Sequence, residues 1–122
     1  MDDNGPVLSI CMTCRDGRED DHETRGGSRL AERILAQLKV QAPANLRIRG
    51  VRCMSQCKRS CIVSLSAPER LTYVFGDLDP QEDIHVDALF ELVSLYSDAE
   101  EGFLERKDRP EPLQASILGR LP

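Results

Sequence analysis

The arrangement of the cysteines constrains this chain more than any other feature of its sequence. They fall in two tight groups: "CMTC" holds Cys11 and Cys14, and "CMSQCKRSC" holds Cys53, Cys57 and Cys61. Three interpretations are open, namely disulfide partners, a redox dithiol, and ligands for a metal that assembles only when the chain folds. An odd number of cysteines argues against a framework built only of disulfides, since at least one thiol would be left over.

The length and composition predict one domain in a reducing compartment. With 122 residues, of which 40% are apolar and 30% charged, the chain is long enough to bury a core. No apolar run approaches the roughly 18 residues of a membrane-spanning helix, and "MDDNGP" lacks the basic-then-apolar pattern of a signal peptide. We therefore expect a cytoplasmic protein with no membrane partner. Thiols stay reduced there, and clustered cysteines are more often metal-binding or catalytic than disulfide-bonded.

Positive charge is concentrated around the second cysteine group. The net charge of the chain is −5, but residues 47–68 contain five basic side chains and no acidic one. These charges form either a solvated strand face or a surface that offsets a negatively charged site and meets an acidic partner. Nucleic acid is not an expected partner, because the whole protein is acidic and the patch has no interleaved aromatic residues.

Hydrophobic patterning predicts the order β-α-β-β-β-α. The segments "VLSIC", "LRIRGVRC", "CIVSL" and "LTYVFG" are typical of strands. One helix is expected from Ser28 as its N-cap, and a second after Asp79-Pro80, with Glu82 in a capping box. The apolar stripes of the two helices are expected to be Leu30, Ala31, Ile34, Leu35 and Leu38, and Val86, Leu89, Phe90, Val93 and Tyr96.

The connections predict how the strands pair. The crossover that contains the first helix is long enough to make the first two strands parallel, and the turn "SAPER" makes the last two antiparallel. We expect a single domain over 1–122 with its core in 6–98. Residues 99–122 are expected to be an extended tail with one helical turn in "LQASILGRL". Its apolar side chains should pack on the domain or on a second subunit, because leaving them in water is costly.

Parallel pairing would bring the two cysteine groups together. Cys11 ends the first predicted strand and Cys53 ends the second, and the carboxyl ends of parallel strands lie at the same edge of a sheet. Four thiolates on two loops suit tetrahedral zinc or an iron–sulfur cluster equally well. Both centres are negatively charged when four thiolates hold them, so the basic surroundings do not decide between them.

The other interpretations are weaker. A thioredoxin-type dithiol needs its first cysteine at a helix N-terminus, which lowers the thiol pKa, whereas about a dozen polar residues separate "CMTC" from the predicted helix. Five grouped cysteines also argue against merely structural buried thiols. His22, in a charged loop, and His85, near the second helix, are weaker ligand candidates than the cysteines. No catalytic triad, phosphate-binding glycine loop or carboxylate pair is present as a specific motif, so an enzyme is not expected.

The layout resembles the thioredoxin-like 2Fe–2S ferredoxins, a group that includes the small subunit of NADH dehydrogenase. The shared features are a strand ending in cysteine, a helix, a strand ending in C-x-x-x-C, a hairpin and a last helix. The segments "CMTCR", "CMSQCKRSCIVSL", "TYVFGDL" and "RPEPLQASILGRLP" resemble more closely a bacterial family of small predicted metal-binding proteins. Members of that family look like offshoots of these ferredoxins and are often encoded beside cobalamin-biosynthesis genes.

The resemblance implies a thioredoxin-like ferredoxin fold with a 2Fe–2S cluster that carries single electrons to a redox partner, in cobalamin or cobalt metabolism. Cys53 and Cys57 stand at the family's third and fourth ligand positions, and Cys61 stands where the ferredoxins have proline. The ferredoxins' second ligand falls near residues 22–24, where this chain has no cysteine. Cys14 is expected to replace it, with His22 or Cys61 as the alternative.

The expected ligands are therefore Cys11, Cys14, Cys53 and Cys57. The basic residues beside them, Arg52, Lys58 and Arg59, are expected to dock an acidic face of the partner. Related ferredoxins often form dimers, which implies a homodimer here. The runner-up function is a zinc- or cobalt-binding metal-delivery module that uses the same cysteines and has no redox role.

Overall fold

The computed structural model describes residues 5–15, 17, 24–41, 46–52 and 59–121. The predicted order β-α-β-β-β-α is confirmed, and a fifth strand follows it. No helix of the described residues is long and apolar enough to cross a membrane. The elements are β1 (Val7–Cys11), α1 (Gly26–Leu38), β2 (Arg47–Val51), β3 (Val63–Ser66), β4 (Thr72–Phe75), α2 (Asp83–Asp98), the 3-10 helices η3 (Glu100–Gly102), η4 (Arg106–Asp108) and η5 (Glu111–Leu113), and β5 (Ile117–Leu121).

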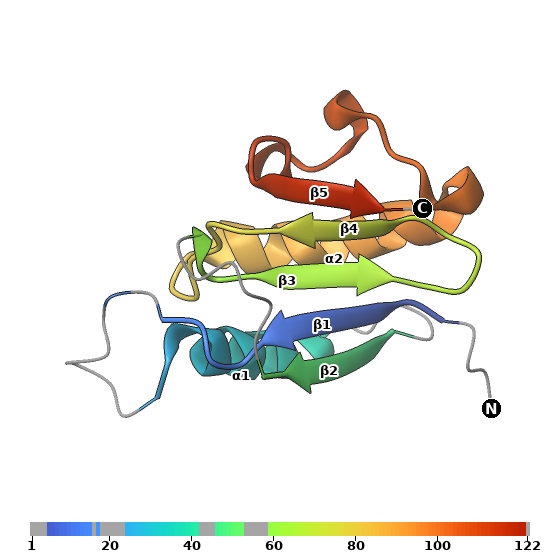
Figure 1. The fold of residues 1–122 in the computed structure, drawn as a ribbon. Coiled ribbons are helices and arrows are strands. Elements are labelled where there is room, and N and C mark those ends of the chain that lie inside the picture. The colour runs from blue at the N-terminus through green and yellow to red at the C-terminus, as the bar shows by residue number, and fades with distance from the viewer. Residues whose placement is uncertain (1–4, 16, 18–23, 42–45, 53–58, 122) are drawn as a thin grey trace.

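The strands form one sheet in the order β2-β1-β3-β4-β5 (Figure 1). As predicted, β1 and β2 are parallel, with Cys11 opposite Val51, and β3 and β4 are antiparallel. Both helices cover the same face of the sheet, α1 behind β1 and β2 and α2 behind β3 and β4 (Figure 1). The carboxyl ends of β1 and β2 therefore share one edge of a two-layered molecule.

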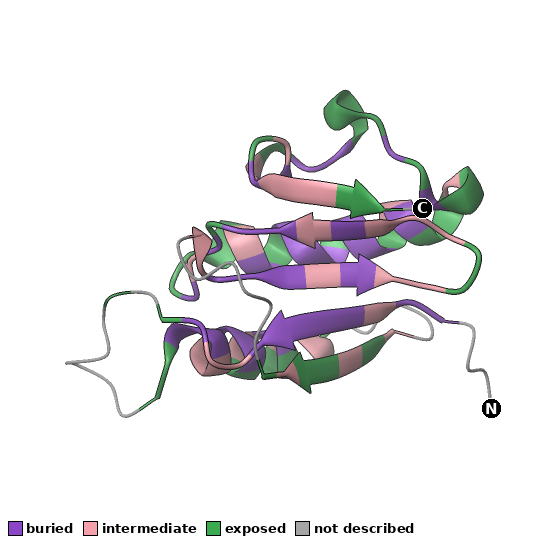
Figure 2. Ribbon diagram, viewed as in Figure 1, coloured by how far each residue is buried: buried purple, intermediate pink, exposed green. Residues whose placement is uncertain are grey.

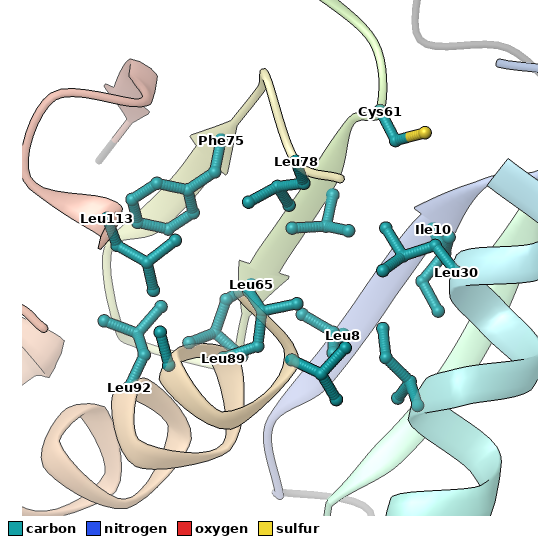
Figure 3. Packing of buried hydrophobic residues seen from close by; sticks show 14 of the residues in the cluster. Leu8, Ile10, Leu30, Cys61, Leu65, Phe75, Leu78, Leu89, Leu92 and Leu113 are labelled. Carbon is teal, nitrogen blue, oxygen red and sulfur yellow. The ribbon is translucent and has the colours of Figure 1, made fainter. Parts of the chain in front are cut away.

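The core lies between the sheet and the helices. Strand alternation supplies one half of it, because register places Leu8, Leu65 and Tyr73 side by side on the helix-covered face, and all three are buried. All five residues of the predicted α2 stripe are buried too, and buried residues alternate with exposed ones along α2 (Figure 2). Figure 3 shows one of the five, Leu89, in the core. In α1 the prediction holds for Leu30, Ala31 and Ile34 and is wrong for Leu35, which is 46% exposed.

Helix α1 begins two residues before its predicted N-cap. Arg25 occupies the N-cap position, and its side chain makes no capping hydrogen bond. Instead, the Gly27 N–H donates to the Cys14 carbonyl at 3.0 Å, and the Ser28 hydroxyl donates to the Met12 carbonyl at 3.2 Å. The start of this helix is fixed by the cysteine loop rather than by a local capping motif.

Helix α2 begins at Asp83, later than the sequence predicts. Glu82 is the N-cap residue and makes no side-chain capping bond, so the predicted capping box is wrong. The Asp79 carboxylate accepts a hydrogen bond from the Gln81 N–H at 2.9 Å, which makes a tight turn ahead of the helix.

The C-terminal segment completes the sheet. Where a helical turn was predicted, residues 117–121 form β5, which pairs antiparallel with β4 and sets Arg120 opposite Tyr73. This pairing satisfies backbone groups that β4 would otherwise expose at a sheet edge. Leu104 and Leu113, which precede β5, are buried (Figure 3 shows Leu113 beside Phe75 and Leu92).

Tyr73→Phe is expected to lower the free energy of unfolding by about 2 kcal/mol. The buried Tyr73 hydroxyl donates to the Gly102 carbonyl and accepts from the Leu104 N–H, both at 2.8 Å. Its removal leaves two buried backbone groups without a partner. Urea denaturation of the variant measures the change, and a loss below about 0.5 kcal/mol would contradict this role of the hydroxyl.

Candidate metal centre

Two thiols lie side by side at the carboxyl end of β1. Cys11 is the last residue of the strand, and the chain turns through Met12 and Thr13 to Cys14. Both cysteines are only 2% exposed, and their thiols are in hydrogen-bonding contact. Within the described residues these cysteines form no disulfide. Two buried sulfur atoms on one short loop are a pair of soft ligands suited to zinc or iron.

Burial raises the pKa of the Cys14 thiol to about 11, and the hydrogen bond with the Cys11 thiol raises it as well. Hydrogen bonds from the Ser60 side chain and the Ile62 N–H act in the opposite direction. At neutral pH the Cys14 thiol therefore keeps its proton, which disfavours Cys14 as the attacking thiol of a thiol–disulfide exchange. A metal ion would displace that proton on binding.

The first turn of α1 packs directly against the cysteine loop. A Cβ atom on Gly27 would lie 1.9 Å from the Cys11 carbonyl oxygen and 3.3 Å from the Cys14 nitrogen, so only glycine allows this approach. The polar residues between "CMTC" and α1 separate them in sequence only, and the prediction that the helix lies away from the thiols is wrong. The raised pKa of Cys14 argues only against this second thiol as the attacking group.

The end of β2 meets the same two thiols. The Thr13 hydroxyl donates to the Arg52 carbonyl. That carbonyl lies 4.0 Å from the Cys11 sulfur, which also lies 3.8 Å from the Thr13 hydroxyl. Arg52 directly precedes Cys53 in the sequence, so one flank of the segment 53–58 lies at the thiol pair.

The other flank of this segment meets the thiols as well. The Ser60 side chain hydrogen-bonds the Cys14 thiol, and the Cys11 N–H donates to the Ile62 carbonyl at 3.0 Å. Arg52 and Ser60, which flank residues 53–58, therefore both contact the Cys11–Cys14 pair.

Cys61 lies two residues before β3 and is fully buried. Its backbone N–H and carbonyl pair with Leu78 at 3.1 and 3.3 Å, and the Ser60–Cys61 peptide bond is cis. Figure 3 shows its sulfur directed away from Leu78 and Phe75.

The remaining predicted ligands, Cys53, Cys57 and His22, lie outside the described residues, as does Lys58. In the part of the chain that the structure describes, no three His, Cys, Asp or Glu residues are grouped so as to hold a metal. The described residues supply half of the donors that a four-thiolate centre needs, namely the buried sulfurs of Cys11 and Cys14. The residues that flank the second cysteine loop lie beside these two sulfurs.

Two other predicted residues have partners elsewhere. Arg59, a predicted docking residue, forms an ion pair with the Asp77 carboxylate, and its Nε lies 2.9 and 3.0 Å from the two carboxylate oxygens. This guanidinium holds the pKa of the Asp77 carboxyl below its usual value. The His85 Nδ1 accepts a hydrogen bond from the Asp79 N–H at 2.8 Å, which occupies that nitrogen's lone pair. Arg52, by contrast, is exposed.

Sequence reasoning missed three residues that shape the site: Thr13, Gly27 and Ser60. The Gly26-Gly27 pair directly ahead of the apolar stripe of α1 was a usable signal, since glycine permits a close backbone approach. Thr13 and Ser60 stand next to cysteines in the chain, but only the folded structure shows which carbonyl or sulfur each one reaches.

A family model described as "Protein of unknown function (DUF1636)" matches residues 8–122. No curated protein matches the chain. Among solved structures, a thioredoxin-like [2Fe-2S] ferredoxin from Aquifex aeolicus is similar, with a TM-score of 0.58 at 15% identity over 96% of this chain and 93% of that chain. A structure of the wild-type ferredoxin from Aquifex aeolicus gives a TM-score of 0.56 at 15% identity, over 95% and 98% of the two chains.

A cysteine-to-serine variant of the Aquifex aeolicus ferredoxin gives a TM-score of 0.56 at 14% identity, over 93% of this chain and 98% of that one. Likeness at this level of identity shows the fold alone. The chain thus has the thioredoxin-like ferredoxin fold, as predicted.

Proposed function

This chain belongs to the family described as "Protein of unknown function (DUF1636)", and we propose that it holds a 2Fe–2S cluster and carries single electrons to a partner redox protein. It makes and breaks no bonds in a substrate of its own. The resemblance of its motifs further implies that it works in the cytoplasm, within cobalamin or cobalt metabolism.

One observation supports this proposal above the others. Arg52 and Ser60, at the two ends of the segment that carries Cys53 and Cys57, both contact the buried Cys11–Cys14 pair. Each of two loops would then supply two thiolates, which together make the four that a 2Fe–2S cluster requires. We propose Cys11, Cys14, Cys53 and Cys57 as the ligands, and Cys61 as a buried neighbour of the site.

A bound 2Fe–2S cluster supplies reversible one-electron transfer. The chain's own residues set the conditions for it. Burial of Cys11 and Cys14 keeps water from their sulfurs. The exposed Arg52, together with Lys58, which lies outside the described residues, would offset the negative charge of the centre and dock an acidic partner surface. Arg59 contributes less positive charge to that surface, because its ion pair with Asp77 neutralises part of its charge.

Metal and sulfide analysis of anaerobically purified protein tests the proposal. We expect about two irons and two acid-labile sulfides per chain, a red-brown colour, and a paramagnetic resonance signal after reduction by one electron. A colourless protein with about one zinc per chain would replace the proposal with a metal-delivery module. A metal-free protein whose Cys11–Cys14 pair cycles with glutathione would make it a thiol oxidoreductase.

A further inference from the structure

Two hydrogen-bond donors approach the sulfur of Cys14 from the segment that leads into β3. They are the Ser60 hydroxyl and the Ile62 backbone N–H. The position of Ile62 is fixed by β1, because its carbonyl accepts the Cys11 N–H at 3.0 Å. Ile62 is fully buried and Ser60 is partly buried, so both donors act where water competes weakly.

The segment that carries these donors is held from its other side as well. Cys61 pairs with Leu78 through two backbone hydrogen bonds, and the Asp77 N–H donates to the Arg59 carbonyl at 2.6 Å. The Arg59 and Asp77 side chains add an ion pair across the same two segments. The backbone that positions the Ser60 hydroxyl beside Cys14 is thus held by hydrogen bonds to neighbouring segments.

We propose that Ser60 tunes the reduction potential of the centre by donating a hydrogen bond to the Cys14 sulfur. The inference rests on the proposed function, in which Cys14 is a ligand. One-electron reduction adds negative charge that is shared with the ligand sulfurs, so a donor to one of them stabilises the reduced form more than the oxidised form. The hydroxyl therefore raises the potential. The Ile62 N–H acts in the same direction, but only Ser60 can be removed by substitution.

A purely structural role for Ser60 predicts something different. If its hydroxyl only positioned the loop, Ser60→Ala would change stability or iron content and leave the potential of the loaded protein unchanged. The reduction potential therefore separates the two roles. Ser60→Thr keeps a hydroxyl on the same carbon and should restore the effect. Ser64, partly buried on β3 opposite Ser9, provides a matched serine within the same stretch of chain.

The experiment measures the midpoint potential, iron content and resonance spectrum of wild type, Ser60→Ala, Ser60→Thr and Ser64→Ala, all purified without air. We expect Ser60→Ala to keep its iron, to show a lower potential and to change its resonance spectrum. Ser60→Thr and Ser64→Ala are expected to match wild type.

Two results would overturn this inference alone: an iron-loaded Ser60→Ala protein with the potential of Ser64→Ala, or loss of iron from Ser60→Ala, which would make the hydroxyl a requirement for assembly. A wild-type protein that contains no iron would overturn the proposed function, and this inference with it.

Discussion

Gly27→Ala is expected to destabilise the protein by about 3 kcal/mol or more, at the upper end of the cost of overpacking. The added methyl group would lie 1.9 Å from the Cys11 carbonyl oxygen. Its neighbour is backbone in the last residue of β1, so no side chain can turn aside. The first turn of α1 would have to leave β1, which would break the hydrogen bond from the Gly27 N–H to Cys14. We expect iron binding to fall with stability.

The direction of the change in stability of Gly27→Ala distinguishes the packing effect from helix propensity. Alanine is a better helix former than glycine by about 1 kcal/mol, so helix propensity alone predicts stabilisation. Gly119→Ala is the matched control, because a Cβ atom at Gly119 meets nothing within 4 Å, and its expected change is within about 0.5 kcal/mol. Urea denaturation of the metal-free proteins measures both variants. A Gly27→Ala protein as stable as the control would show that α1 does not pack against the cysteine loop as described.

Serine substitutions of the cysteines are expected to divide them into two classes. Cys11→Ser, Cys14→Ser, Cys53→Ser and Cys57→Ser should each lose the cluster, because a hydroxyl is a poor substitute for a thiolate on iron. Each should also lower stability, since a centre that binds only the folded chain stabilises it by its binding energy. Iron content and thermal unfolding of anaerobically purified variants measure the two effects.

Cys61→Ser is the internal control of this series. Cys61 is fully buried, and a serine hydroxyl there would cost about 1–3 kcal/mol if it found no partner. We expect stability to fall while iron stays bound. The reverse pattern, in which Cys61→Ser strips the iron and Cys14→Ser keeps it, would show that Cys61 is the fourth ligand.

The spacing of apolar residues predicted most of the helices and strands, because each element buries one face and that burial repeats at a fixed interval along the sequence. The α2 stripe and the strand alternation each follow from burial of one face, so they could be predicted from spacing alone. The start of α1 could not, because it depends on contact between Gly27 and Cys14. Strand β5 was missed for a similar reason: its pairing with β4 is a tertiary interaction that short-range pattern does not encode.

The candidate site shows the same division. Parallel pairing of β1 and β2 was enough to predict that the end of β2 would meet Cys11, and the contact with Arg52 agrees with it. Ser60 could not be singled out, because many polar residues stand near cysteines in the chain and only the fold selects one. The roles of Cys53 and Cys57 stay predictions, since both lie outside the described residues.

The contacts that position Cys11 and Cys14 have a consequence for how the mature protein is made. Cys11 is set by its strand partners and Cys14 by the first turn of a helix, through hydrogen bonds between protein groups. We therefore expect this half of the donor set to take its position as the chain folds, before the inorganic part is added. In a zinc finger, by contrast, the chain folds only around its ion.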